Sequence, residues 1–195
     1  MMTLENTRFR VKIEIEETYT VGSADNRLRC DVIHNPLGFS RGSMVKAYDI
    51  HVRSAEGERE TIVVGSSYYI PNFLLVDDLL AMTIVDKLVI LRLEDCEIVQ
   101  VIEFEPNYLL DIFPWLDGYI LWGELDVVKL DAAFAPVWSF SARDMLVDVN
   151  VPVGESLILQ DDRIIVRDFL EYRYEVDRNG KLIAEYAPDK TSREL

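Results

Sequence analysis

The chain has 195 residues, 49% of them hydrophobic, and carries 35 acidic against 20 basic side chains. This hydrophobic content excludes general disorder, and a chain of this length buries a sizeable core without disulfides or metal ions. We expect neither a membrane span nor an export leader, and hence a soluble cytoplasmic protein. Cys30 and Cys96 are predicted to be reduced thiols, with a single bridge between them as the alternative.

The N-terminal third begins with a clear strand pattern. Residues 8–16 alternate between apolar and charged side chains, which predicts a strand with one buried face and one solvated face. Residues 22–44 collect glycine, serine, asparagine and proline, and they predict a long loop. Residues 45–64 surround a polar turn and predict a β-hairpin, which a short strand at 68–70 follows.

Three similar units follow from residue 77 onward. Lys87, Asp126 and Arg163 occupy matching positions 39 and 37 residues apart, each after an apolar strand and before an outer strand. A fourth apolar segment closes each unit, and these closing segments are 108–113, 145–151 and 181–186. Four short strands at this period are typical of a propeller blade. We therefore predict an all-β fold with about three propeller-like four-stranded repeats and an N-terminal strand and hairpin as a cap.

We expect a single domain with three parts, which are a strand and hairpin region 1–76, a β-repeat region 77–186 and a polar tail 187–195. Chance alignment of apolar stretches is the alternative to true repeats. A ring takes at least four blades. Either the hairpin at 45–64 and the strand at 68–70 form a degenerate fourth unit, or the units form an open, curved stack of sheets. Residues 76–86 fit a helix by length, but the repeat alignment favours a strand.

The charge is divided unevenly between these parts. Residues 1–76 hold 10 acids and 9 bases, whereas residues 77–195 hold 25 acids and 11 bases, a net charge of −14. Such a field repels nucleic-acid phosphates and anionic membranes, and it attracts basic proteins. We therefore expect no nucleic acid and no membrane as partner, but a protein with a basic surface. The alternative is that the acids only keep a β-rich surface soluble.

Three sequence patterns suggest chemistry but lack its usual context. Residues 38–42 form a G-x-S-x-G motif around Ser40, yet no strand precedes it and no alternating helices and strands surround it, so we expect a glycine-rich loop. Five metal-ligand side chains are spaced too loosely to predict a metal site, namely Cys30, Asp31, His34, Asp49 and His51. Adjacent acids such as Asp77-Asp78 point to opposite faces of a strand and fit turns better than an acid pair.

The second repeat concentrates side chains that are common at interfaces. Tryptophan and arginine combine a large contact area with a polar group, and acids accompany them here. The candidate binding residues are Trp122, Glu124, Asp126, Trp138, Arg143 and Asp144, with Asp168 at a similar place in the third repeat. The alternative is that they serve packing and turn bonding. We assign no catalytic residue and no cofactor.

Residues 136–144, which read PVWSFSARD, are followed later by Asp168-Phe169, Tyr172 and Tyr174. In these residues the chain resembles bacterial β-repeat proteins of no assigned function. The resemblance covers about residues 77–185 and implies no catalytic residue. Some of these proteins are similar to small acidic antitoxins or immunity proteins of toxin loci. The turn at 177–180 also resembles that of pyrroloquinoline-quinone propeller repeats, but it implies no cofactor.

These observations favour a non-catalytic protein-binding module, for example an immunity protein that plugs the cationic active site of a toxin. One alternative is a hydrolase that uses Ser40 or a pair of carboxylates in a cleft. Another is a structural protein that forms a homodimer to hide the edges of its sheets.

Overall fold

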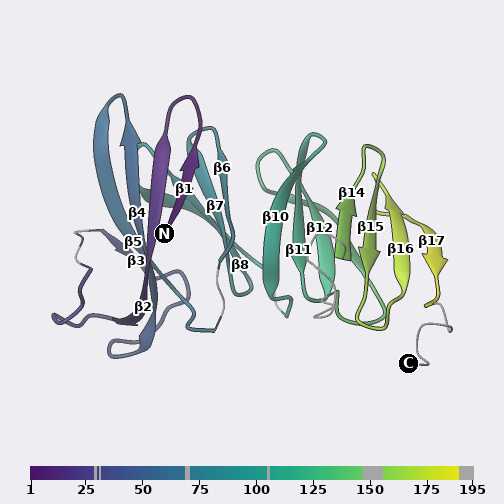
Figure 1. Cartoon of the computed structure of the whole chain (residues 1–195), viewed down its shortest axis with the longest axis horizontal. Helices are drawn as coiled ribbons and strands as arrows, with labels where there is room; N and C mark the ends of the chain where they lie inside the picture. Colours follow the sequence, from purple (N-terminus) through teal and green to yellow (C-terminus); the bar gives the residue numbers. More distant parts are fainter. Residues whose placement is uncertain (29, 31, 69–70, 105, 147–155, 189–195) are drawn as a thin grey trace. The chain divides into compact units, whose positions relative to one another are not determined.

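The computed structural model describes residues 1–28, 30, 32–68, 71–104, 106–146 and 156–188. Seventeen strands lie within these residues, in four antiparallel or mostly antiparallel sheets (Figure 1). The chain divides into two compact units, residues 1–105 and residues 106–195, and each unit contains two of the sheets. No helix in the described part of the chain is both long enough and apolar enough to cross a membrane.

Unit 1 begins with a five-stranded sheet in the order β1-β2-β4-β5-β3. Its strands are β1 (Met2–Glu5), β2 (Arg10–Thr20), β3 (Ile33–His34), β4 (Met44–Ser54) and β5 (Gly57–Gly65). The alternation in β2 buries Val11 and Ile13 and leaves the charged side chains between them at least partly exposed, as predicted. The hairpin predicted at 45–64 is confirmed as β4 and β5, which pair in continuous register from Lys46 to Ser54.

A four-stranded sheet completes unit 1. Its strands are β6 (Phe73–Val76), β7 (Leu79–Ile84), β8 (Lys87–Arg92) and β9 (Glu97–Glu103). One face of this sheet and one face of the first sheet share a single hydrophobic core. The opposite face of the first sheet is covered at one end by the loop before β4, where Leu28 and Phe39 pack over Tyr19 and Val64.

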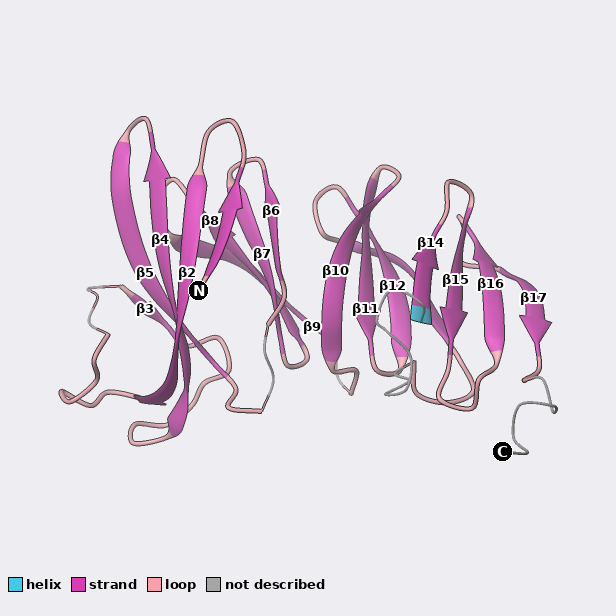
Figure 2. Ribbon diagram, in the orientation of Figure 1, coloured by secondary structure: helices cyan, strands magenta, loops and turns pink. Residues whose placement is uncertain are grey.

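Unit 2 contains two further four-stranded sheets (Figure 2). The third sheet holds β10 (Leu109–Trp115), β11 (Gly118–Gly123), β12 (Asp126–Asp131) and β13 (Pro136–Ser141). The fourth holds β14 (Leu157–Leu159), β15 (Arg163–Arg167), β16 (Arg173–Asp177) and β17 (Leu182–Tyr186). Both sheets contribute to one core, in which Trp122 of β11 and Val166 of β15 are buried.

The predicted all-β fold with propeller-like four-stranded repeats is confirmed. Strands β8, β12 and β15 begin at Lys87, Asp126 and Arg163, which are the three positions aligned in the sequence. Each lies inside a four-stranded antiparallel meander, the arrangement of a propeller blade. The segment at 76–86 forms β6, a turn and β7 rather than a helix.

The structure differs from the prediction in where the first two repeats begin. The segment 108–113 does not close the first repeat, because it belongs to β10 and pairs with β11 at the start of the next sheet. In the first repeat, β6 takes the corresponding place before β7, so this repeat begins at Phe73. A two-residue turn connects β6 to β7, and another connects β10 to β11. Asp77 in the first turn and Leu116 in the second adopt positive φ angles of 48° and 52°.

Two predicted strands reach beyond the described residues. Of the segment 145–151, only Met145 and Leu146 are described, and neither is in a strand. Of the strand predicted at 68–70, only Tyr68 is described.

Candidate functional site

Three loops meet at one end of unit 2 and are tied together through their backbones. Leu146 N donates a hydrogen bond of 2.6 Å to Glu124 O, the carbonyl that follows β11. Phe169 N, after β15, donates one of 2.7 Å to Met145 O. We define the loop surface as seven apolar and acidic side chains of these loops that are exposed or half-buried, namely Glu124, Leu125, Asp144, Met145, Phe169, Leu170 and Glu171.

A buried carboxylate holds two of these loops in place. Asp168 is fully buried, and its Oδ1 accepts a hydrogen bond of 2.9 Å from Tyr172 N. Its Oδ2 accepts one of 2.7 Å from the Tyr174 hydroxyl, which in turn accepts one of 3.3 Å from Arg143 N. Burial, and then the hydrogen bond to Asp168, raises the pKa of Tyr174 to about 12. Asp168 is therefore a positioning residue for the loop surface.

The loop surface combines apolar and acidic side chains. Leu125, Met145, Phe169 and Leu170 are between 37% and 45% exposed. Glu124 and Asp144 lie in the same loops, and burial raises the pKa of Glu124. Large apolar side chains that gather at an exposed site and have polar neighbours are typical of surfaces that bind other proteins.

The sequence-predicted candidates therefore fall into two groups. Glu124, Arg143, Asp144 and Asp168 lie in the three joined loops, and Asp126 follows at the start of β12. The side-chain amide of Asn107 binds this turn, because its Oδ1 accepts hydrogen bonds from Leu125 N at 2.8 Å and from Asp126 N at 3.3 Å.

Trp122 and Trp138 take part in packing instead. Trp122 is 3% exposed in the core of unit 2, and its buried Nε1 donates to no residue that the structure describes. Trp138 is half-buried, and its Nε1 donates a hydrogen bond of 3.0 Å to Arg178 O. Its ring lies edge-on to Trp115, with the ring centroids 6.3 Å apart.

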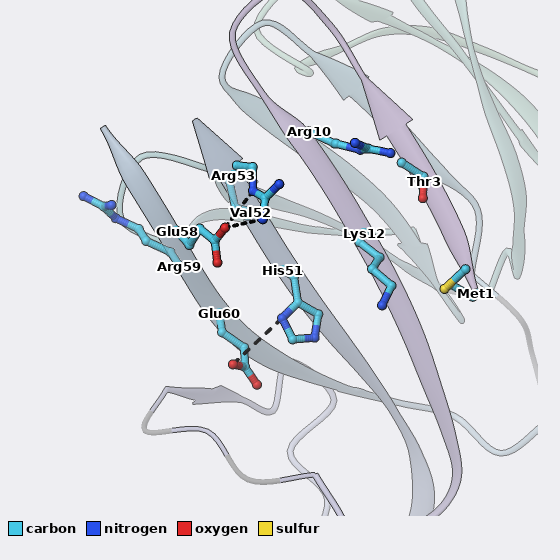
Figure 3. Close-up of a pocket in the computed structure, with 10 residues that line it drawn as sticks. All are labelled: Met1, Thr3, Arg10, Lys12, His51, Val52, Arg53, Glu58, Arg59 and Glu60. Carbon is cyan, nitrogen blue, oxygen red and sulfur yellow. Dashed lines mark hydrogen bonds and ion pairs between the residues drawn. The ribbon is translucent and has the colours of Figure 1, made fainter. Parts of the chain in front are cut away.

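A second polar cluster lies on the first sheet of unit 1, on the face turned away from the shared core. The two-residue period of β4 places Asp49 and His51 on the same face, and the register places Glu60 of β5 opposite His51. His51 Nε2 lies 3.0 Å from Asp49 Oδ2. His51 Nδ1 lies 3.8 Å from Glu60 Oε2, and Figure 3 marks this contact with a dashed line. Asp49 and His51 are among the metal-ligand side chains considered from the sequence, whereas Glu60 is not.

His51 and Glu60 line an open groove with a volume of about 510 Å³. Lys12 of β2 lies opposite His51 in the register, and it pairs with Glu14. This ion pair holds the pKa of Glu14 below its ordinary value, first through the hydrogen bond and then through the charge of Lys12. At the far end of the groove, Arg53 Nε donates a hydrogen bond of 2.7 Å to Glu58 (Figure 3).

The other side chains considered for metal binding do not join this cluster through their own polar atoms. Cys30 Sγ donates a hydrogen bond of 3.1 Å to the backbone oxygen of Glu60. His34 Nε2 lies 2.8 Å from Cys96 O. Both cysteines are free thiols, and burial raises the pKa of Cys96 to about 11. Asp31 lies outside the described residues.

The G-x-S-x-G motif forms a loop between β3 and β4, as predicted. Gly38 and Gly42 have positive φ angles of 68° and 88°, which glycine adopts without steric cost. Ser43 N donates a hydrogen bond of 3.0 Å to Ser40 O, which closes a turn. The polar contacts that the structure gives the His51 ring are with Asp49 and Glu60, not with Ser40.

No protein-family model and no curated protein sequence matches the chain. In structure, it is similar to the CNH domain of AfRom2, with 8% identity, a TM-score of 0.50 and coverage of 74% of this chain and 48% of that one. It is also similar to the computationally designed protein Ika8, with 8% identity, a TM-score of 0.52 and coverage of 94% and 60%. BamB from Moraxella catarrhalis has 15% identity, a TM-score of 0.48 and coverage of 87% and 52%.

The chain thus spans between 48% and 60% of the length of these three structures. The likeness to the CNH domain and to Ika8 concerns the fold, and it agrees with the propeller-like sheets described above.

Proposed function

We propose that the protein is a non-catalytic binding module whose loop surface binds a protein with a basic surface. The observation that carries the proposal is the loop surface itself, where Leu125, Met145, Phe169 and Leu170 stand exposed beside acids. Apolar side chains supply the contact area of an interface, and charges around them set the partner and the rate of encounter. Glu124, Asp144 and Glu171 supply that charge here.

The charge of the repeats supports a basic partner. The four-stranded repeats begin at Phe73, and residues 73–76 are uncharged, so the net charge of −14 belongs entirely to the repeats and the residues after them. An ion pair such as Arg143–Glu185 at 2.6 Å neutralises one base together with one acid, so it leaves this excess of acids unchanged. The Arg143 guanidinium also lies 5.1 Å from the centre of the Tyr172 ring.

A bacterial immunity protein is the concrete form of this proposal. The resemblance of residues 136–144 to bacterial β-repeat proteins supports it, and an acidic surface is complementary to the cationic active site of a nuclease-type toxin. The partner sought first is therefore a basic protein encoded beside this chain.

The test measures binding kinetics between the full chain and each basic protein encoded by a neighbouring gene, at about 50 mM and about 500 mM NaCl. The decisive variant is the triple substitution Glu124→Gln/Asp144→Asn/Glu171→Gln. We expect the association rate constant to fall about tenfold at low salt, because these charges steer the encounter. High salt should reduce the difference between the variant and the wild type.

A matched control removes the same charge from another surface. The substitutions Glu5→Gln, Asp25→Asn and Glu56→Gln neutralise three exposed acids of unit 1. The control should bind within about twofold of the wild type. Equal loss in both triple variants would reject the loop surface as the binding site, and binding that is independent of salt would reject electrostatic recognition.

Self-association is a second candidate, and the last strand favours it. Strand β17 ends the fourth sheet, so one of its edges has no partner strand among the described residues. Leu182, Ile183 and Tyr186 on this strand are 41%, 53% and 49% exposed. An exposed apolar edge strand is a template for pairing with a second copy. The molar mass from light scattering tests self-association, and a monomer at high protein concentration would reject it.

A further inference from the structure

We infer that Asp49, His51 and Glu60 form a binding site for a divalent first-row transition-metal ion, of which Zn²⁺ is the probe. One ligand atom from each of the three side chains lies within 4.8 Å of the other two. The site shares no residue with the loop surface, because it is built from the first sheet of unit 1, and it does not depend on the proposed protein partner.

Strand geometry fixes the three ligands on one face. Asp49 and His51 are two residues apart on β4, so their side chains share a face, and Glu60 faces His51 directly across the β4–β5 pair. Both strands run in continuous register along this hairpin, so their backbones are held in place by the ladder of hydrogen bonds. The ligands therefore project from a rigid support rather than from loops.

The strongest sign that a ligand is missing from this cluster is the carboxylate of Asp49. Its side chain is only 6% exposed, and its Oδ1 is buried without a hydrogen-bond donor among the described residues. A buried carboxylate oxygen without a partner has lost its hydrogen bonds to water and has formed none within the protein, which costs free energy. A cation bound between Asp49, His51 and Glu60 would supply that missing interaction.

The distances agree with coordination after small side-chain adjustments. An ion lies about 2.0–2.2 Å from nitrogen or carboxylate oxygen ligands, so two ligand atoms of one ion are about 3–4 Å apart. His51 Nε2 and Asp49 Oδ2 already stand 3.0 Å apart. The Glu60 side chain is 43% exposed, so it has room to rotate toward the ion.

The local charge also suits a cation. Lys12 of β2 lies opposite His51, but its ammonium group pairs with Glu14. Lys12 therefore does not compensate the negative charge of Asp49 and Glu60. The mixed donor set indicates the kind of ion. Mg²⁺ and Ca²⁺ prefer oxygen ligands alone, whereas one imidazole with two carboxylates suits Zn²⁺ or Mn²⁺. The remaining coordination positions would face the open groove.

The experiment uses the full chain after treatment with a chelator and titrates Zn²⁺ by calorimetry, with Mg²⁺ and Ca²⁺ for comparison. We expect one ion per chain and tighter binding of Zn²⁺ than of Mg²⁺ or Ca²⁺. Two variants, His51→Gln and Glu60→Gln, should each weaken Zn²⁺ binding at least about tenfold. Co²⁺ provides a spectroscopic readout, because its visible absorption bands should change when the imidazole is removed.

The matched control is Glu58→Gln, which removes the same charge from the same face of β5, two residues from Glu60. It should bind Zn²⁺ within about twofold of the wild type. The side chains of His51 and Glu60 are about 40% exposed, so both variants should fold, and thermal melting checks this. The inference is overturned if the wild type binds no Zn²⁺, if both variants bind as the wild type does, or if Cys30→Ser alone abolishes binding.

Discussion

Replacing Tyr174 with phenylalanine tests how the loop surface is held together. The substitution removes the hydroxyl that donates the 2.7 Å hydrogen bond to Asp168 Oδ2 and accepts one from Arg143 N. Because Asp168 is fully buried, its carboxylate would lose the hydrogen bond that the Tyr174 hydroxyl donates to this charged group, and no water would replace it. A hydrogen bond of this kind contributes about 1.5–3 kcal/mol to the free energy of unfolding. For a chain of 195 residues this lowers the melting temperature by about 4–8 °C.

The assay is thermal unfolding followed by circular dichroism, with Tyr172→Phe as the matched control. Tyr172 contributes its backbone N–H to Asp168, which the control retains, and the structure gives its hydroxyl no hydrogen bond among the described residues. The control should therefore change the free energy of unfolding by less than about 0.5 kcal/mol. Equal effects of Tyr174→Phe and Tyr172→Phe would refute the assignment of Asp168 as the residue that positions these loops.

Three further predictions concern stability. Gly180→Ala should cost about 2 kcal/mol or more, because Gly180 has φ +80° and an added Cβ would lie 2.7 Å from the Trp138 ring. Gly38→Ala, at φ +68° with nothing within 4 Å, should cost only the backbone strain of about 1 kcal/mol; equal melting temperatures for the two variants would count against the contact with Trp138. Trp138→Phe should cost about 0.5–1.5 kcal/mol through the lost hydrogen bond to Arg178 O, and unchanged denaturant unfolding would contradict this. Alkaline pH should destabilise the chain, because the folded state favours the neutral form of the Tyr174 phenol. The contribution of this phenol to the free energy of unfolding is complete below pH 10, the ordinary pKa, and is lost as the pH rises through the folded-state pKa of about 12. Tyr174→Phe should flatten this loss, and an unchanged pH profile would contradict the raised pKa.

The features that the sequence predicted correctly are those set by local pattern. Lys87, Asp126 and Arg163 mark the first residues of β8, β12 and β15 because each follows a short turn after an apolar strand. The alternation in residues 8–16 likewise predicts which side chains of β2 enter the core. Such patterns depend only on neighbours within a few residues, so they predict strands without knowledge of the fold.

Which repeat the segment 108–113 belongs to was not predictable from local pattern. The segment 108–113 is equally apolar at the end of one repeat or at the start of the next, and the tight turn at Leu116 decides its partner. Glu60 was missed for a related reason. It faces His51 only in the observed register of β4 and β5, and a slip of one residue would move its side chain to the other face.

The loop surface was predicted only in part. The residue types of Glu124 and Asp144 in the dense second repeat predicted a binding role, but nothing in the sequence predicted that Met145 and Phe169 lie together. The hydrogen bond from Phe169 N to Met145 O joins them in space. The tryptophans illustrate the opposite case, since Trp122 has the residue type of an interface and yet lies in the core.

Hydrogen–deuterium exchange of the full chain, alone and with a bound basic partner, tests most directly the claim that the loop surface is the binding site. The account predicts that the partner slows exchange in peptides covering residues 124–126, 143–146 and 168–171, and leaves β4 and β5 unchanged. Protection confined to unit 1, with these three loops unaffected, would contradict it.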